Sequence, residues 1–454
     1  MKDSLEVIIP DDSNSLIKEQ DKCIQCGYCM NVCRNEITVA RMFDIDKAIK
    51  PICVNCGQCA NMCPTEAIRE KFDYINIKKI LKNKDKKVVF SVAPAVRVAI
   101  GEEFGLDPGM NMEGKIVSAL KKIGADYVFD ITFGADLTIM EEAMELVNRI
   151  NNGGILPMFT SCCPAWVKYA EIFYPELLPN LSSCKSPITM QSSIIKTYFC
   201  KVEKIDVNDI VNIVVAPCTA KKAEIKREEI NRANKYWNKD IYDTDYVITT
   251  RELAMLLKEE NVDLAKLDSS KFDSPLGRGS GAGIIFGNSG GVAEAALRTA
   301  YYYLTGDNLK KEELEFNSIR GMNGSKECSV KIKEKEIKIA VCNGMASAKD
   351  LIDKLLNKDV YYDFVEVMNC NCGCIAGGGQ PKITMLNKMT TKRARMDGIY
   401  DIDKNDKLRL CHDNPEIKEI YNIFLEKPNS EIAEKLLHTH YEDKSYLLGG
   451  KSND

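Results

Sequence analysis

Two cysteine runs near the N-terminus have a spacing that suits iron–sulfur chemistry. Each run reads Cys-x2-Cys-x2-Cys-x3-Cys. Such a pair of runs holds two 4Fe–4S clusters, and the fourth cysteine of each run ligates the other cluster. We therefore expect one cluster on Cys23, Cys26, Cys29 and Cys63, and a second cluster on Cys53, Cys56, Cys59 and Cys33. Structural zinc is the weaker interpretation, because zinc sites use two pairs of ligands rather than three close cysteines and a distant one.

Cysteine also stands beside proline or glycine in three segments further along the chain. The segments are TSCCPAW (160–166), APCTAKKAE (216–224) and EVMNCNCGCIAGGGQP (366–381). Proline and glycine shape turns and let the backbone approach a bulky ligand closely. A single buried cysteine is more often a small core residue than a ligand, but the three segments together favour a second metal site. The remaining cysteines lack this setting and are expected to be core or surface residues: Cys184, Cys200, Cys328, Cys342 and Cys411.

One segment predicted to be helical carries ionisable side chains on a single face. Glu142, Glu145 and Arg149 follow one another at i, i+3 and i+7, so a helix would align them. On spacing alone, a solvated surface is the more common reason for such a face. The alternative is a proton path, since burial raises the pKa of a glutamate and lets it both accept and release protons.

Composition indicates an ordinary globular chain. Of 454 residues, 45% are hydrophobic and 28% are charged, and the formal net charge is −4. This charge implies no general attraction to nucleic acid or to an anionic membrane. The N-terminal segment MKDSLEVIIPDDSNS has no apolar signal-peptide core, and no apolar run approaches the ~18 residues that span a bilayer. With 19 cysteines, the chain fits a reducing cytoplasm in which thiolates bind metal.

The elements that must position these residues divide into three regions. Residues 1–20 are expected to form an arm or an edge strand, residues 21–82 the repeated cysteine unit, and residues 83–450 a larger domain that ends in helices at about 390–445. In the larger domain, the short apolar strands KVVFSV, VNIVVAPC and IKIAVCNG alternate with segments of helical period. Strands that alternate with helices predict α/β layering.

The three later cysteine segments resemble the signatures of the FeFe hydrogenase catalytic domain. The resemblance runs from about residue 20 to 445 and includes FGADLTIMEEAMELVNRI, FGNSGGVAEAAL and the C-terminal NPEIKEIY and LLHTHY. It implies an α+β ferredoxin-like domain with two 4Fe–4S clusters, followed by a larger α/β catalytic domain. The expected activity is the interconversion of two protons and two electrons with H2. The expected cofactor there is the H-cluster, a 4Fe–4S cubane joined to a two-iron unit that carries CO, cyanide and a bridging dithiolate.

The resemblance also assigns roles to individual residues. It implies Cys163, Cys218, Cys370 and Cys374 as cubane ligands, with Cys374 as the bridge to the two-iron unit. Lys221 would donate to a cyanide ligand, and the other residues expected against the cofactor are Pro94, Ala95, Glu224, Met368, Gly377 and Gly378. Protons would pass in the order Cys162, Glu142, Ser182, Glu145 and Arg149. A ferredoxin or similar electron carrier and the hydrogenase maturation enzymes are the implied partners.

Several positions depart from the usual pattern of the family. They are Ala95, Ala165, Ala216, Ile188, Asn371 and Cys372, and they resemble the branch called group B. The motifs leave two alternative functions: an H2 sensor with little turnover, and an iron–sulfur assembly protein of the related eukaryotic type. The assembly relatives lack parts of the catalytic cysteine set.

Two other features are expected to carry no chemistry. The glycine-rich stretch 277–291 lacks a clean preceding strand and a following acidic residue, so no nucleotide site is expected there. His438 and His440 are placed in the final helix, where packing at the helix end is favoured over a metal site.

Overall fold

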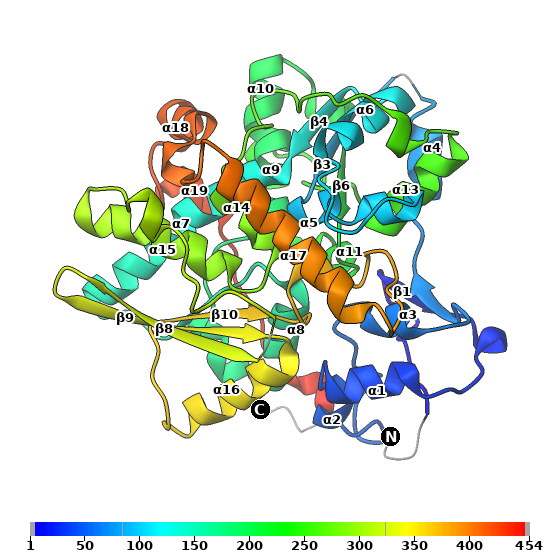
Figure 1. Cartoon of the computed structure of the whole chain (residues 1–454), viewed down its shortest axis with the longest axis horizontal. Helices are drawn as coiled ribbons and strands as arrows, with labels where there is room; N and C mark the ends of the chain where they lie inside the picture. The colour runs from blue at the N-terminus through cyan, green and yellow to red at the C-terminus, as the bar shows by residue number, and fades with distance from the viewer. Residues whose placement is uncertain (1–4, 84, 323, 450–454) are drawn as a thin grey trace.

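The computed structural model describes residues 5–83, 85–322 and 324–449. The first four residues of the expected arm and Gly450, the expected end of the larger domain, lie outside these ranges. Two four-stranded sheets and the helices around them form most of the molecule, and the cysteine runs lie at one end (Figure 1).

The cysteine runs lie on a small unit of short helices and one two-stranded sheet. Its helices are α1 (Tyr28–Asn35), α2 (Val39–Met42) and α3 (Gln58–Met62). Strand β1 (Leu16–Lys18) pairs antiparallel with β2 (Ile68–Glu70), so the expected arm contributes a strand to this unit. We call residues 16–70 the N-terminal unit.

The first large sheet is fully parallel and has the order β4-β3-β6-β7. Its strands are β3 (Lys87–Val92), β4 (Tyr127–Asp130), β6 (Ile210–Ala216) and β7 (Tyr246–Thr249). Nearly every residue of β3 and β6 is buried, which explains why these strands are continuous apolar runs rather than alternating ones. Strands expected at KVVFSV and VNIVVAPC are therefore found where the sequence predicts them.

The second sheet has the order β5-β10-β9-β8. Its strands are β5 (Met158–Phe159), β8 (Ser325–Ile332), β9 (Lys335–Asn343) and β10 (Phe364–Met368). Strands β5, β10 and β9 are parallel, and β8 pairs antiparallel at the edge. Because parallel strands end at a common edge, the segments that follow β5 and β10 begin close together.

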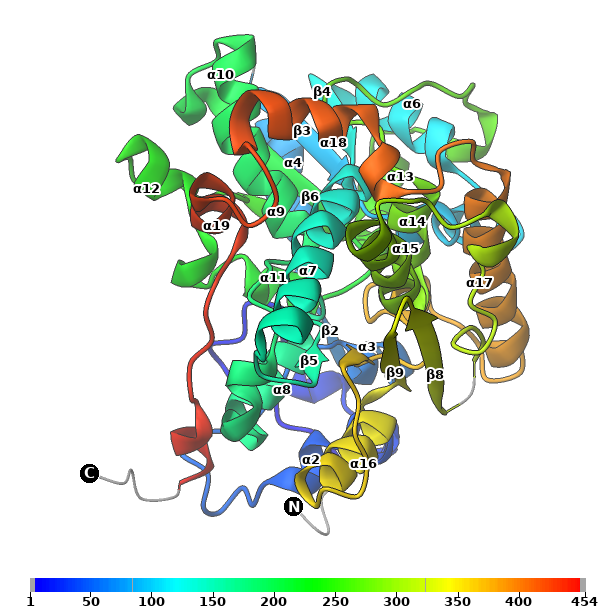
Figure 2. The same cartoon turned by 90° about the vertical axis from the view of Figure 1, so that its left-hand side faces the viewer.

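Three long helices surround these sheets. Helix α7 (Ile131–Asn152) begins where the side chain of Asp130 accepts a hydrogen bond from the backbone N–H of Thr132, and it packs against α9 (Pro187–Ile194) and α15 (Gly291–Thr305). Helix α17 (Lys388–Asn405) crosses one face of the molecule, and Figure 2 shows α7, α15 and α17 from the side. The remaining α-helices are α4 (Tyr74–Ile80), α5 (Pro94–Arg97), α6 (Glu113–Ile123), α8 (Pro164–Phe173), α10 (Cys200–Glu203), α11 (Ala220–Glu224), α12 (Ala233–Trp237), α13 (Thr250–Glu259), α14 (Gly281–Ile284), α16 (Met345–Leu356), α18 (Pro415–Ile420) and α19 (Glu431–Leu437).

The final helix is shorter than expected. Helix α19 ends at Leu437, and His438 has extended backbone angles (φ −108°, ψ 160°). His438 forms an isolated antiparallel β-bridge with Cys184, so the prediction that His438 lies within the helix is wrong. The chain therefore leaves the helix one residue before the histidine and runs beside a distant segment.

Packing explains one glycine of the stretch 277–291, and it bears on the domain boundary expected at residue 82. In the stretch 277–291, a Cβ on Gly279 would lie 2.0 Å from the Thr132 hydroxyl, so the glycine permits close packing against α7. Helix α4 packs on α13, and Ile77 belongs to the apolar core around the first sheet. The domain boundary expected at residue 82 stays a prediction.

Candidate functional site

A mostly apolar cavity of about 80 Å³ lies where the two sheets meet. Five cysteines line it, together with the ammonium of Lys221: Cys162, Cys163, Cys218, Cys370 and Cys374. They come from three segments that are far apart in the sequence. The structure thus brings the three later cysteine motifs to one place.

Each motif reaches the cavity from the carboxyl end of a strand. Strand β5 is followed by the Cys162–Cys163 pair, and Cys163 is the N-cap of α8, whose first residue is Pro164. Strand β6 is followed by Pro217 and Cys218, and β10 is followed by Asn369 and Cys370. This is the edge of a parallel sheet at which ligands usually bind.

The loop between Cys370 and Cys374 has an unusual backbone. Cys372 and Gly373 both have left-handed φ angles, 79° and 83°, and a short 3-10 turn begins at Cys374. A Cβ on Gly373 would lie 2.5 Å from the backbone nitrogen of Ser289, so only glycine fits this approach. The turn lets two cysteines four residues apart face one cavity without a helix between them.

The chemistry of these donors fits an iron–sulfur cubane. Burial raises the pKa of Cys218 well above its usual value and raises that of Cys163, while it raises the pKa of Cys370 to about 11 and that of Cys374 to about 12. The sulfurs also act on one another, since Cys370, Cys163 and Cys374 all raise the pKa of Cys218. Four buried thiolates would repel one another unless a cation such as cluster iron compensated them.

Lys221 is held in place beside the cysteines. Its Nζ donates to Glu224 Oε2 at 2.9 Å and to the carbonyl oxygen of Cys162 at 3.0 Å. Burial alone would lower the pKa of Lys221, but the Glu224 carboxylate outweighs it and the pKa is raised. A charged ammonium in an apolar cavity suits an anionic group on a bound cofactor.

The other residues expected at the cofactor divide between the cavity and its surroundings. Pro94, Ala95, Met368 and Gly377 line the cavity. Gly378 instead faces the N-terminal unit, where an added Cβ would lie 2.0 Å from the carbonyl oxygen of Cys56. Gly378 therefore permits the two parts of the molecule to touch through their backbones.

Most of the residues that depart from the family pattern lie at or near this cavity. Ala95, Ala216 and Ile188 line it. Ala165 is buried within α8. Cys372 is buried in the core and its backbone N–H donates to Asn343 Oδ1 at 2.5 Å. Cys372 does not line the cavity.

The buried carboxyl of Glu142 acts on the Cys162 thiol. Burial raises the pKa of Cys162 well above its usual value, and the Glu142 carboxylate is the next largest cause. Glu142 is 1% exposed, and neither of its carboxyl oxygens has a hydrogen-bond partner among the described residues. Burial, with the Glu145 charge, raises the pKa of Glu142 to about 8. Such a carboxyl can take up and release a proton near neutral pH.

Ser182, Glu145 and Arg149 form a hydrogen-bonded chain that leads outward. The Ser182 hydroxyl donates to Glu145 Oε2 at 2.8 Å, and Arg149 Nη2 donates to Glu145 Oε1 at 2.6 Å. The Ser182 hydroxyl also accepts a hydrogen bond from the backbone N–H of Cys184 at 3.2 Å. Ser182 lowers the pKa of Glu142, against the effect of burial, so it acts on both glutamates of the predicted path.

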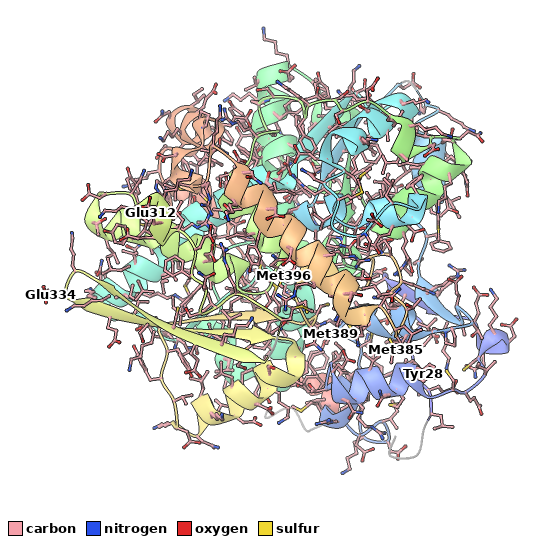
Figure 3. The ribbon with its side chains drawn as sticks, viewed as in Figure 1. Tyr28, Glu312, Glu334, Met385, Met389 and Met396 are labelled. Carbon is pink, nitrogen blue, oxygen red and sulfur yellow. The ribbon has the colours of Figure 1, made fainter. Side chains whose placement is uncertain are left out.

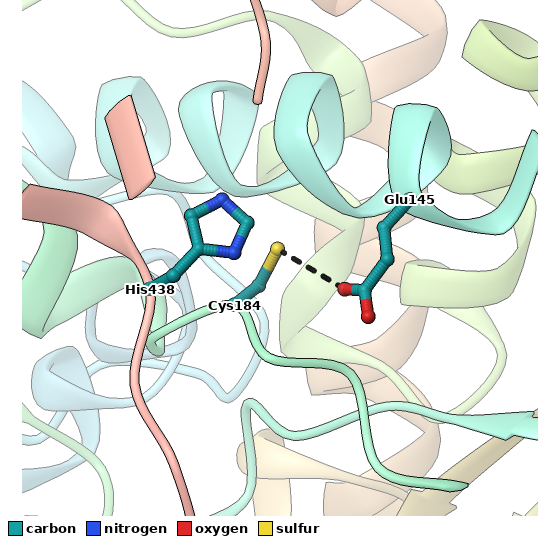
Figure 4. Close-up of side chains that lie close together, drawn as sticks. All are labelled: Glu145, Cys184 and His438. Atoms are coloured by element: carbon teal, nitrogen blue, oxygen red, sulfur yellow. Dashed lines mark hydrogen bonds between the residues drawn. The ribbon is translucent and has the colours of Figure 1, made fainter. Parts of the chain in front are cut away.

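Three residues beside Glu145 were not predicted to belong to this region: Glu141, Cys184 and His438. The Cys184 thiol donates to Glu145 Oε2 at 3.9 Å, with His438 next to it (Figure 4). His438 contacts the Ser183 hydroxyl through Nδ1 at 2.8 Å and Glu141 Oε2 through Nε2 at 3.1 Å. No sequence spacing could reveal this cluster, because His438 lies more than 250 residues from Ser183 and Cys184.

The cysteines of the N-terminal unit act on one another across the two runs. Cys26 and Cys63 both raise the pKa of Cys29, after burial, and so lie near it. In the same way Cys53 and Cys33 are the charged groups that act most strongly on Cys59. The crossed pairing of the two runs stays a prediction.

The second cysteine run, Cys53 to Cys63, lies against the cavity cysteines. Cys370 is the charged neighbour that most raises the pKa of Cys56, after burial. Gln58 bridges the two regions, since its Nε2 donates to Cys370 Sγ at 3.1 Å and to the carbonyl oxygen of Ala376 at 2.9 Å. At the other end of the unit Cys26 is exposed. Cysteines thus extend from the surface to the cavity.

These features define the class as an iron–sulfur oxidoreductase with a buried, thiolate-lined centre. Comparison with protein families agrees. The model of the iron-only hydrogenase large subunit, C-terminal domain, matches residues 86–378. Models of the iron hydrogenase small subunit and of a 4Fe-4S dicluster domain match residues 389–444 and 22–68.

Individual relatives give the same result. Iron hydrogenase 1 from Clostridium pasteurianum is 40% identical over 457 residues, which cover 97% of this chain and 78% of the relative. Subunit HndD of an NADP-reducing hydrogenase from Solidesulfovibrio fructosivorans is 42% identical over 458 residues, which cover 96% of this chain and 76% of HndD. A structure of the apo FeFe hydrogenase HydA1 from Chlamydomonas reinhardtii matches 83% of this chain and all of its own, with a TM-score of 0.71 and 38% identity.

The chain belongs to the iron-only, or FeFe, hydrogenase family. It is an oxidoreductase that interconverts protons and electrons with H2, and its cofactors are two 4Fe–4S clusters and the H-cluster. The expected fold class, a ferredoxin-like domain followed by a larger α/β catalytic domain, is confirmed. These relatives do not favour the sensor alternative. Within the described ranges, no helix is long and apolar enough to cross a membrane.

Proposed function

We propose that H2 is formed and split in the cavity beside Cys162 and Lys221. The cubane ligands are Cys163, Cys218, Cys370 and Cys374, with Cys374 as the bridging thiolate. The observation that carries this proposal is the convergence of those thiols, from three distant segments, on one buried cavity. The two-iron unit, when bound, supplies an open coordination site for hydrogen chemistry.

The protein's own residues orient the cofactor and exclude water. The Lys221 ammonium, fixed by Glu224, presents a positive charge to an anionic ligand. Pro94, Ala95, Met368 and Gly377 supply apolar walls. Low polarity strengthens every electrostatic contact inside the cavity and limits side reactions.

Protons move between the cavity and the surface through side chains of α7 and its neighbours. Cys162 exchanges a proton with Glu142, and Glu142 exchanges it with Ser182, which acts on the Glu142 carboxyl. Ser182 and Glu145 then pass the proton on to bulk water beside Arg149, whose guanidinium stays protonated and holds the Glu145 carboxylate in place. The raised pKa of Glu142, about 8, suits both directions of transfer.

Electrons enter at the exposed end of a ferredoxin domain (residues 21–82) and reach a catalytic domain (residues 83–450). The path is supported by the order of cysteines from exposed Cys26 to Cys56, which lies beside Cys370. The carrier is a ferredoxin or similar protein in the cytoplasm, and maturation enzymes load the two-iron unit. Exposed Tyr28, Met385 and Met389 lie toward the same end of the molecule in Figure 3 and offer an apolar contact for such a carrier.

H2 evolution and uptake by the fully loaded protein test this proposal. With a reduced dye as electron donor we expect sustained H2 production, and the infrared spectrum of the same sample should contain CO and cyanide bands. Bands without turnover would instead support the sensor alternative. A loaded preparation that shows neither bands nor turnover would contradict the proposed site.

A further inference from the structure

Lys168 of α8 is a cation of the catalytic domain that faces the second cysteine run. It is half-buried, five residues after Cys163. Its Nζ donates to Asn55 Oδ1 at 2.6 Å. Asn55 lies between Cys53 and Cys56, so this hydrogen bond joins α8 to the loop that carries the proposed ligands of the second cluster.

Asn55 is itself tightly held in an unusual conformation. It is buried and has a left-handed φ of 63°. Its backbone N–H donates to Cys53 Sγ at 3.3 Å, and its carbonyl oxygen accepts from the Thr219 hydroxyl at 2.6 Å. The Lys168 ammonium is therefore coupled to Cys53 through one residue.

Lys168 lacks the partner that neighbouring cations have. It lies on a cavity of about 330 Å³ that Cys53 also lines. Around this cavity Lys50 pairs with Asp12 at 2.6 Å, and Arg227 and Lys444 both pair with Glu171. No carboxylate of the described chain lies within ion-pair distance of Lys168, so its charge is not neutralised locally.

Lys168 and Cys53 are linked by geometry. Both line one cavity, and Asn55 is hydrogen-bonded to the Lys168 ammonium through its side chain and to Cys53 Sγ through its backbone N–H. Net charge, hydrogen bonds to sulfur and solvent exposure set the reduction potential of an iron–sulfur cluster. A nearby cation favours the reduced state because that state carries one more negative charge.

We propose that Lys168 is a positioning residue that raises the reduction potential of the second cluster. By doing so it makes this cluster a better electron acceptor, next to the catalytic cavity. The proposal rests on the ligand assignment of the proposed function, Cys53, Cys56, Cys59 and Cys33. It does not require H2 turnover.

The test is an EPR-monitored redox titration of the holoenzyme and of three variants. Lys168→Gln removes the charge but keeps a donor for Asn55, and Lys168→Arg keeps the charge. Lys226→Gln is the matched control, since Lys226 lines the same cavity but lies over the Tyr242 ring, 5.0 Å from its centroid. The first-run cluster serves as an internal reference in every sample.

We expect Lys168→Gln to reduce the equilibrium constant for reduction of one cluster about tenfold, a shift of ~59 mV to lower potential. Lys168→Arg should keep the wild-type reduction potential, and Lys226→Gln should leave the potentials of both clusters unchanged. Unchanged potentials in Lys168→Gln, or equal shifts in the Gln and Arg variants, would overturn the proposal. So would a shift in Lys226→Gln as large as that in Lys168→Gln.

The iron content of each variant is measured to show whether a substitution has caused loss of a cluster. If Lys168→Gln loses the second cluster while Lys168→Arg retains it, the result supports the charged contact; loss in both variants overturns the charge argument. Dye-driven H2 evolution is measured in the same preparations. A potential shift in protein that never evolves H2 would uphold the role of Lys168 and count against the proposed function alone.

Discussion

At the scale of single residues, the Cys162 thiol lines the cavity and the buried Glu142 carboxyl acts on it. Replacement of Cys162 by alanine removes the proposed proton carrier but none of the proposed iron ligands. We expect Cys162→Ala to lower H2 turnover by at least ~100-fold, in line with the loss of a general acid–base group. The measurement is H2 evolution with reduced dye. The CO and cyanide infrared bands should persist, and unchanged turnover would exclude Cys162 from the proton path.

Glu142 predicts a specific pH dependence of stability. Its pKa is raised from 4.5 to about 8 by burial, so the folded state holds the proton more tightly than the unfolded state. The contribution to stability is complete below pH 4.5 and is lost as pH rises toward 8. Within this window wild-type protein should lose ~1.4 kcal/mol per pH unit relative to Glu142→Gln, which cannot ionise.

Unfolding midpoints of the two proteins at pH 6 and pH 8, under argon at one scan rate, give the comparison. The unfolding midpoint of Glu142→Gln should rise relative to that of the wild type as pH increases. A constant difference across this range would show that Glu142 titrates at an ordinary value.

The residues around Glu145 show where sequence reasoning stopped. Glu145 and Arg149 could be placed on one helix face from their spacing alone. Cys184 and His438 could not, because a β-bridge between distant segments brings them there. Cys184 was expected to be a core or surface residue and is buried, but its contact with Glu145 depends on tertiary structure.

At the scale of elements, the positions of the cysteines follow from strands that could be predicted. The apolar runs that became β3, β6 and β9 have the β-branched composition of buried parallel strands. Strand β5 has only two residues, too few to leave a periodic signal. The backbone turn at Cys372 and Gly373 could not be predicted either, because a cysteine rarely adopts a positive φ angle.

The two cysteine runs predict crossed ligation. Since Cys63 raises the pKa of Cys29 and is the proposed fourth ligand of that cluster, Cys63→Ala should damage the cluster of the first run. Iron content should fall by about one 4Fe–4S cluster, and the EPR signal of the cluster on Cys53, Cys56 and Cys59 should remain. Cys33→Ala is the reciprocal control and should affect the second cluster. Loss of the same cluster in both variants would refute the crossing.

At the scale of the whole molecule, a buried ion pair joins the N-terminal unit to the catalytic domain. Arg251 Nη2 lies 2.7 Å from Glu70 Oε2, and its Nη1 also donates to Asn61 Oδ1 at 2.6 Å. Burial would raise the pKa of Glu70, but Arg251 outweighs it and the pKa is lowered. The interface is thus specified by charge as well as by backbone contact at Gly378.

Removal of Arg251 should be costly. Arg251→Met leaves the Glu70 carboxylate buried without its partner, which destabilises a protein by ~3–5 kcal/mol. The expected result is a lower thermal midpoint and faster proteolytic release of the N-terminal unit. Lys382→Gln is the control: it breaks an exposed pair with Glu66 and should change stability by at most ~1 kcal/mol. Equal effects of the two substitutions would contradict the role of this contact.

Sequence reasoning predicted the overall arrangement because the local signals agree with one another. Cysteine spacing, apolar strands and helical period all point to the same two parts. The contact between those parts was not predicted, since Gln58, Gly378 and Arg251 carry no signal of their partners across the interface.

The central claim is that thiols from three distant segments hold one iron assembly next to Cys162. An iron-edge anomalous difference map from crystals of the fully loaded protein tests it most directly. We predict a cubane peak in bonding contact with Cys163, Cys218, Cys370 and Cys374, and a two-iron peak in the cavity beside Cys162 and Lys221. Iron held by other side chains, or a loaded protein with no iron in this cavity, would contradict the account.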